Sequence, residues 1–151
     1  MSDFHQTIEQ KLKLMNPPAM TVEERAIMAM LLKTFYEAGA SMTQKDLVRS
    51  DRWLQARPDH HTMLERGDLE TPMRQVRKVI NDLRTKYNAP IISDHSGYWI
   101  CRSQTEAMEY LDRLGKEAKA TVAAHFTTYN SMKRALNTTS QLFENLSLVI
   151  R

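Results

Sequence analysis

Residues 71–87 constrain the fold of this chain more strongly than any other segment. In the stretch TPMRQVRKVINDLRTKY, apolar residues recur at every third or fourth position, which is the spacing of one face of an α-helix. They are Val76, Val79, Ile80, Leu83 and Tyr87. Thr71 can cap the first turn, and Pro72 can take the first helical position, where its missing N–H is not needed. The sequence therefore predicts an amphipathic helix over 71–87 that buries one face.

The opposite face of this predicted helix is basic. Between Thr71 and Asn88 there are five lysines and arginines and one aspartate, a local net charge of +4, whereas the whole chain carries +3. The outward positions are Arg74, Lys78, Asn81 and Thr85, flanked by Gln75, Arg77, Arg84 and Lys86. Arginine, lysine, asparagine and glutamine have the donor geometry that suits phosphates and base edges in the major groove. This face is a candidate for nucleic-acid contact, with an ordinary solvated helix face as the alternative.

A β-hairpin is predicted directly after this helix. Residues 89–93 and 98–101 are two short runs rich in branched and aromatic residues, and the polar turn Asp94-His95-Ser96-Gly97 separates them. That pattern is typical of two antiparallel strands. Adjacent strand residues point to opposite faces, so we expect Trp99 in the core and Tyr98 on the exposed side.

The segments before residue 71 read as helices joined by an acidic connection. Residues 1–18 form a short amphipathic arm that packs on its own core or on a partner subunit, and the NPP run ends it. A second helix begins at a capping box of Thr21 and Glu24 and runs until Gly39, and a third lies between Thr43 and Pro58. Residues 59–70 carry four acids and one base. We expect this stretch to be mostly loop, with His60 and His61 exposed and not bound to a metal.

A long helix is predicted over 103–137. It opens with a second capping box, Ser103 to Glu106, and its apolar residues keep three-and-four spacing throughout. The stripe is long for one small domain, so we expect it to form a homodimer seam. The seam residues are Leu111, Leu114, Ala118, Val122, Phe126 and Tyr129. Residues 138–151 follow as a C-terminal tail.

Composition and motif content exclude several classes of protein. A length of 151 residues is about one domain, and no run approaches the roughly 20 apolar residues that cross a bilayer. The first ten residues lack the apolar core of a signal peptide, and one cysteine cannot form an internal disulfide. No Gly-rich phosphate motif and no catalytic signature occurs. We expect a cytoplasmic protein that is not an enzyme, needs no cofactor or metal and contacts no membrane.

The order of helices, basic helix and hairpin is that of a winged helix-turn-helix fold. The stretch RQVRKVINDLRTKYNAPIISDHSGYWICRSQTEAMEYLDRL resembles the recognition helix and wing of winged-helix DNA-binding proteins of phages and prophages. The shared features are I-x-x-L-R late in the basic helix, a short apolar strand, a serine-containing turn with Gly-Tyr, and a capped helix. A similar local shape occurs in the DNA-binding end of biotin-ligase-type repressors. The resemblance covers about 21–114 and is strongest over 74–111.

This resemblance implies a role for each outward residue. Arg74, Lys78, Asn81 and Thr85 would face a DNA groove, Arg77 and Arg84 would contact phosphates, and His95 and Ser96 would lie at the wing tip. The expected fold is mainly α with a small β-hairpin: an arm over 1–18, a winged helix-turn-helix domain over 19–102, a long helix over 103–137 and a tail over 138–151.

The expected function is regulation of transcription or replication by a homodimer that binds an inverted repeat in double-stranded DNA. The alternative is a winged-helix module that binds a protein partner instead of DNA. The acidic 59–70 segment and the small overall charge favour that alternative.

Overall fold

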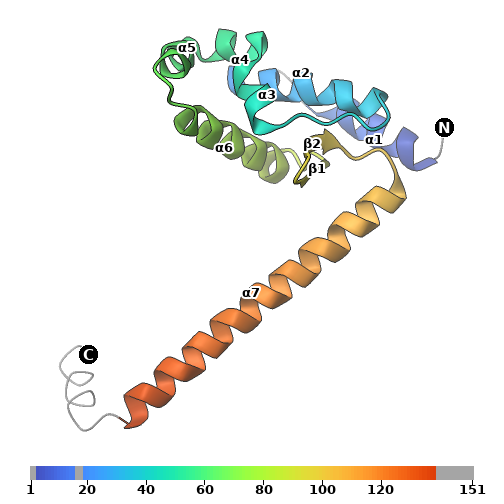
Figure 1. The fold of residues 1–151 in the computed structure, drawn as a ribbon. Helices are drawn as coiled ribbons and strands as arrows, with labels where there is room; N and C mark the ends of the chain where they lie inside the picture. Colours follow the sequence, from blue (N-terminus) through green and yellow to red (C-terminus); the bar gives the residue numbers. More distant parts are fainter. Residues whose placement is uncertain (1–2, 16–18, 139–151) are drawn as a thin grey trace. The chain divides into compact units, whose positions relative to one another are not determined.

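The computed structural model describes residues 3–15 and 19–138, and it confirms a mainly helical fold with one hairpin and a long C-terminal helix (Figure 1). The chain forms two compact parts, Met1–Met108 and Glu109–Arg151. The described elements are α1 (Asp3–Leu14), α2 (Val22–Tyr36), α3 (Gln44–Arg49), α4 (Asp51–Ala56), α5 (Pro58–Glu65), α6 (Glu70–Lys86), β1 (Ile91–Asp94), β2 (Gly97–Ile100) and α7 (Gln104–Thr138). The predicted tail, 138–151, lies outside the described residues except for the last residue of α7.

Helices α1 and α2 follow the sequence pattern. In α1, Ile8 is buried in the same core as α2, and His5 stacks on Phe35 with ring centroids 4.3 Å apart. The arm therefore packs on its own domain, which is one of the two arrangements that the sequence left open. The capping box before α2 is present: the Glu24 backbone N–H donates to Thr21 Oγ1 (3.1 Å) and the Thr21 N–H donates to Glu24 Oε1 (2.9 Å).

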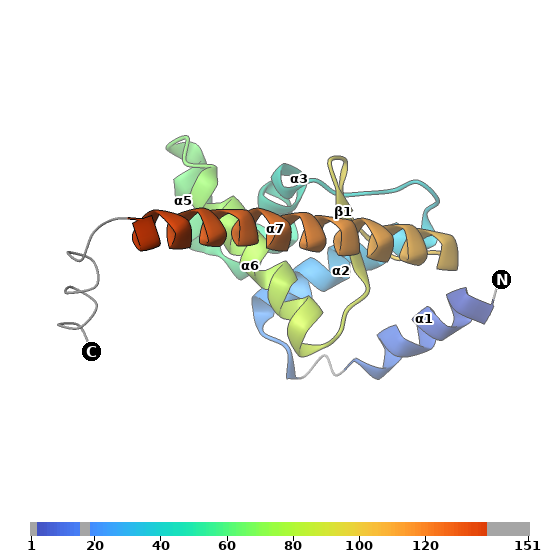
Figure 2. The same ribbon diagram turned by 90° about the horizontal axis from the view of Figure 1, so that it is seen from below.

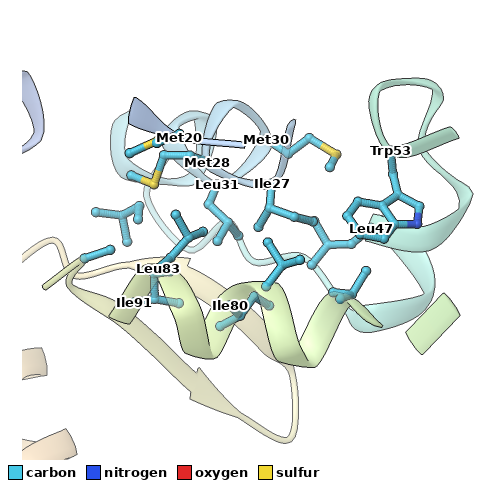
Figure 3. Close-up of a cluster of buried hydrophobic side chains, with 14 of the residues drawn as sticks. Met20, Ile27, Met28, Met30, Leu31, Leu47, Trp53, Ile80, Leu83 and Ile91 are labelled. Atoms are coloured by element: carbon cyan, nitrogen blue, oxygen red, sulfur yellow. The ribbon is translucent and has the colours of Figure 1, made fainter. Parts of the chain in front are cut away.

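The core lies between α2, α6 and the hairpin (Figure 3). Ile27 and Leu31 of α2 and Leu83 of α6 are fully buried there. A buried polar side chain in this layer is satisfied on both sides: Thr34 Oγ1 donates to the Leu31 carbonyl (2.6 Å) and accepts from the Ile100 N–H (3.0 Å). Because a buried unpaired N–H would be destabilising, Thr34 fixes the strand β2 against α2.

The segment from Thr43 to Leu69 differs from the sequence-based expectation. Where one helix was expected before Pro58, Ser50 separates α3 from α4: its Oγ donates to the Leu47 carbonyl (2.7 Å) and accepts from the Trp53 N–H (3.3 Å). The expectation of a mostly looped 59–70 was wrong, because α5 occupies Pro58–Glu65 and only Arg66–Leu69 connect it to α6. Proline at the first helical position of α5 suits a helix start.

His60 was expected to be exposed, and this was wrong, whereas His61 is exposed. The His60 side chain is 1% exposed because the fully buried Trp53 donates from Nε1 to His60 Nδ1 at 3.0 Å. The imidazole is therefore a hydrogen-bond acceptor and is held in its neutral form. Burial lowers the pKa of His60 below its usual 6.5. This hydrogen bond satisfies the indole nitrogen of Trp53 and the Nδ1 of His60, so both atoms can be buried.

We expect the free energy of unfolding to depend on pH through His60. Its pKa is lower in the folded chain than in the unfolded one, so the stabilisation is complete above about pH 6.5 and falls as the pH drops toward the lowered value, by up to about 1.4 kcal/mol per pH unit. Urea unfolding at pH 7.5 and 5.5 measures this change. The His60→Asn variant, whose side-chain oxygen can still accept from Trp53, should lose less stability over the same interval. An equal loss in both proteins would contradict the assignment.

Helix α6 begins earlier than predicted. It starts at Glu70, no side chain caps it at Leu69, and Thr71 is not the cap: its N–H donates to Asp68 Oδ1 at 3.1 Å. Pro72 is the third helical residue, still within the first turn, where backbone N–H groups have no intrahelical acceptor. The apolar stripe itself is confirmed, since Val76, Val79, Ile80 and Leu83 are buried.

The hairpin is confirmed, with one change at its aromatic residues. Strands β1 and β2 are antiparallel, Ile91 pairs with Ile100, and Met42 forms a further antiparallel bridge to Tyr98. Tyr98 packs against the core, whereas Trp99 is half-buried and outside the core cluster, so the expected assignment of these two faces was wrong. Tyr98 shares its strand face with Ile100, two residues later, which is fully buried in the core.

Arg102, Trp99 and Glu106 join the hairpin to the start of α7. Arg102 Nη1 donates to the carbonyl of Thr34 (3.3 Å) in the last turn of α2 and to those of Glu37 (2.7 Å) and Ala40 (3.1 Å) just after it. The Glu106 carboxylate accepts from Trp99 Nε1 (3.0 Å) and from the Arg102 N–H (2.9 Å). Of the two hydrogen bonds of the second predicted capping box, the structure shows the one from the Glu106 N–H to Ser103 Oγ, at 3.2 Å.

Helix α7 is one continuous helix of 35 residues (Figure 2). Its side chains over 108–135 are exposed apart from the half-buried Tyr110, and they include the five large apolar residues of the predicted seam: Leu111, Leu114, Val122, Phe126 and Tyr129. Within residues 3–15 and 19–138, no helix has the length and apolar character that crossing a bilayer requires.

Candidate nucleic-acid interface

The outward face of α6 is the candidate interface. Its buried stripe packs against α2 and α3, and Asp68 holds the first turn through the Thr71 N–H, a bond that also lowers the pKa of the Asp68 carboxyl. With one face fixed in the core, the residues half a turn away must point outward. The structure places Arg74, Lys78, Asn81 and Thr85 there, all of them exposed. This part of the predicted site is brought together as expected.

Two cations of this row are available to a ligand. Among the described residues, neither Arg74 nor Lys78 has an ion-pair partner. Thr85 Oγ1 donates to the Asn81 backbone carbonyl at 2.9 Å, and the Asn81 side chain is exposed. No acid interrupts the row itself, and Asp82 beside it is paired with Lys86 at 3.9 Å.

The flanking residues of the predicted site are used within the protein. Gln75 Nε2 donates to Glu23 Oε2 at 3.2 Å, which ties α6 to α2. Arg77 donates to Glu70 at 2.9 Å and to Gln44 Oε1 at 3.2 Å. Lys86 lies 3.8 Å from Glu24 Oε2 while its side chain is still half exposed. These three residues border the row of outward residues, and each already makes a hydrogen bond or an ion pair with another side chain of the protein.

Arg84 was expected to contact phosphates, but its guanidinium holds the hairpin. Nε and Nη2 donate to the Ile91 carbonyl at 3.1 and 3.0 Å, and Nη2 also donates to Ser93 Oγ at 3.1 Å. The side chain is half-buried in this arrangement. A phosphate contact from Arg84 would require these bonds to open, so its role in the structure is to set the position of β1 on α6.

The hairpin turn presents His95 and Ser96 to solvent, as expected. Asp94 Oδ1 accepts from the Ser96 N–H (2.7 Å) and from Ser96 Oγ (2.6 Å), which closes the turn. Ser41 Oγ donates to the Ser96 carbonyl at 3.2 Å. The turn contains no lysine or arginine, so a cationic contact from it depends on protonation of His95.

A shallow groove of about 350 Å³ lies between α3, the start of α6 and the hairpin turn. Gln44 spans it, donating to the Tyr98 hydroxyl at 2.9 Å and accepting from Arg77. Lys45 lines the groove together with His95 and is exposed. Lys45 could not be placed at this site from the sequence, because only the fold brings the start of α3 beside a turn 50 residues further on.

Among the described residues, no group of three or more His, Cys, Asp or Glu side chains is placed to hold a metal ion.

The comparisons with known proteins add no relative. No protein-family model, no curated protein and no solved structure matches this chain. The fold and the basic helix define the class that the geometry supports: a helical domain with a hairpin placed directly after a basic, outward-facing helix.

Proposed function

We propose that this chain binds double-stranded DNA, with the outward face of α6 in the major groove and the hairpin alongside as a wing. The observation that carries the proposal is the exposed row of Arg74, Lys78, Asn81 and Thr85, in which both cations lack an ion-pair partner among the described residues. An α-helix with such side chains fits the width of the major groove.

The arrangement around α6 supports a winged-helix mode of binding. Helices α2 and α3 pack against α6, and the hairpin follows α6 directly in the chain. Met42 adds a single antiparallel bridge to Tyr98, on the other edge of β2. The resemblance to winged-helix proteins of phages and prophages points the same way. We infer a regulator of transcription or replication that acts by occupying a promoter or an origin.

Each outward residue has a specific chemical capacity. Arg74 can donate two parallel hydrogen bonds to guanine O6 and N7, and Asn81 can pair with the adenine edge. Lys78 suits phosphate or guanine, and Lys45 at the groove suits phosphate, because a lysine ammonium acts as a point charge. Base contacts from the first two would select a sequence, whereas phosphate contacts would fix the register of the protein on the duplex.

We expect measurable binding to random-sequence duplex DNA that weakens steeply with salt, because each neutralised phosphate releases counterions. Fluorescence anisotropy of a labelled duplex at low and moderate salt measures it. Lys78→Ala should weaken binding on all sequences and reduce the salt slope by about one. Lys13→Ala removes an equal charge from an exposed position on α1 and should bind as the parent does.

Absence of binding by the parent at low salt would contradict the DNA proposal. It would favour the protein-partner alternative, in which the same fold serves as an interaction module. The acids of the 59–70 segment give that alternative less support than the sequence did, because several are engaged within the chain: Asp59 accepts from Arg57 at 3.0 Å, Asp68 accepts from the Thr71 N–H and Glu70 pairs with Arg77.

Once a preferred site has been selected from random DNA, Arg74→Ala or Asn81→Ala should lower affinity for it by about 1–3 kcal/mol and relax the preference at one base position. The measurement is a comparison of anisotropy titrations on the selected site and on single-base variants. If both variants discriminate among bases as the parent does, α6 is not the element that reads the sequence.

A further inference from the structure

The stripe on α7 is the largest apolar feature that the described protein leaves in water. Its members recur at three- and four-residue steps and therefore share one side of the helix. Phe126 is 62% exposed and Tyr129 is 61% exposed, and Leu111 and Val122 are comparably open. A long exposed apolar stripe with charged residues on the opposite face indicates a surface that another helix covers.

We propose that two copies of this chain pair through α7 in antiparallel orientation, with Val122 at the two-fold axis. Residues equally far before and after Val122 then lie opposite each other. Ala118 lies four residues before it and Phe126 four after; Gly115 lies seven before it and Tyr129 seven after. Each large ring of one copy therefore faces a small residue of the other. Parallel pairing in register would instead place Phe126 and Tyr129 against the same residues of the second copy. It would leave a gap between the helices at Ala118 and Gly115.

Gly115 gives a separate indication of the same orientation. Glycine inside a helix is about 1 kcal/mol less favourable than alanine. In the single chain, a Cβ added at Gly115 would meet nothing within 4 Å, so nothing in the described chain requires glycine there. The approach of the Tyr129 ring from a second copy supplies a reason for the missing side chain.

The charges along α7 are complementary only in the antiparallel orientation. Residues 104–112 contain three acids and no base, whereas residues 118–138 contain three bases and no acid. Antiparallel pairing places Asp112, ten residues before Val122, near Lys133 of the second copy, eleven residues after it. Parallel pairing would place like charges together at both ends, which is unfavourable.

The antiparallel pair has a consequence for the whole dimer. Each α7 starts at Gln104, 18 residues before Val122, so the two helix starts are about 54 Å apart along the axis at 1.5 Å per residue. The two N-terminal parts are then carried by opposite ends of the helix pair. The proposal specifies the homodimer that the sequence predicted, and it does not depend on DNA binding.

Sedimentation of the full chain without DNA tests the pairing. The parent should sediment as a dimer. Val122→Glu places two carboxylates at the axis and should weaken dimerisation at least 100-fold, giving monomers at micromolar concentration. Ala120→Glu introduces the same side chain on the opposite face of α7 and should remain dimeric. A monomeric parent, or equal sedimentation of the two variants, would overturn the proposal, provided that far-UV circular dichroism shows equal helix content.

The orientation is tested by distances between spin labels in the dimer. In a Cys101→Ala background, nitroxides are attached to Lys116→Cys or Arg134→Cys, both on the outer face of α7. Antiparallel pairing centred on Val122 predicts axial offsets of about 18 Å at position 116 and about 36 Å at position 134. Pulsed electron–electron double resonance should therefore give a clearly longer distance between the two labels at position 134 than at position 116. Equal distances at both positions indicate a parallel pair and would overturn the orientation. Because no DNA is present, neither result bears on the DNA proposal.

Discussion

Trp53→Ala is expected to lower the free energy of unfolding by about 3–5 kcal/mol, the range for truncating a fully buried tryptophan. The side chain is 0% exposed. Its loss opens a cavity in the buried cluster that also contains Leu47 (Figure 3), and it removes the N–H that pairs with His60 Nδ1. An imidazole nitrogen left unpaired in the core adds to the loss, because a buried polar atom needs a partner. Urea unfolding at pH 7.5, followed by far-UV circular dichroism, measures the change.

The second tryptophan provides the matched control. Trp99 is half-buried, donates to Glu106 at 3.0 Å and lies 5.8 Å from the Arg102 guanidinium carbon. Trp99→Ala removes one hydrogen bond and a half-buried cation–π contact, so we expect a loss of about 1–2 kcal/mol. Equal losses in the two variants would show that Trp53 is not the buried anchor of α4 and α5.

Helix α6 and the hairpin could be predicted from the sequence because the information for them is local. The buried stripe of α6 repeats with the helical period over four turns, and Gly97 marks the hairpin turn. The row from Arg74 to Thr85 follows automatically, since the residues opposite a buried stripe must face outward. The candidate site was therefore recognisable in outline before any contact was known.

Helix α5 could not be predicted in the same way, because its burial depends on a single polar contact. Its stretch PDHHTMLE has no apolar periodicity, and His60 is its only buried residue. What makes that burial possible is the indole N–H of Trp53, seven residues earlier, which satisfies the ring. A sequence pattern read by hydrophobicity alone treats His60 as a surface residue.

The structural roles of Arg84 and Arg102 could not be predicted from the sequence either. Arg84 and Arg102 look like surface cations, yet both donate to backbone carbonyls that the tertiary fold brings to them. The acceptors of Arg102 are more than 60 residues away along the chain. Long side chains reach acceptors whose positions are not visible in the local sequence. Only the structure shows which basic residues hold the fold and which remain available to a ligand.

Gly97 is the position where backbone geometry leaves least room for any other residue. Its φ is +129°, a conformation that L-residues rarely adopt. A Cβ there would lie 2.5 Å from the Met42 carbonyl oxygen and 2.7 Å from its carbonyl carbon. Both are backbone atoms, and the same Met42 oxygen accepts the Tyr98 N–H at 2.8 Å. The clash cannot be relieved by moving a side chain; it requires the bridge between Met42 and the hairpin to open.

Gly97→Ala is therefore expected to lower the free energy of unfolding by about 3 kcal/mol or more, the sum of backbone strain and the lost bridge. Opening the bridge would also displace Tyr98 from Gln44, and Gln44 supports Arg77 at the edge of the outward face of α6. Gly39→Ala and Gly67→Ala are the controls: φ is +77° and +84°, but an added Cβ meets nothing within 4 Å, so strain alone should give about 1–2 kcal/mol. Thermal and urea unfolding of the three variants measures the difference. If Gly97→Ala is no more destabilising than the controls, the hairpin is not held in place by its bridge to Met42.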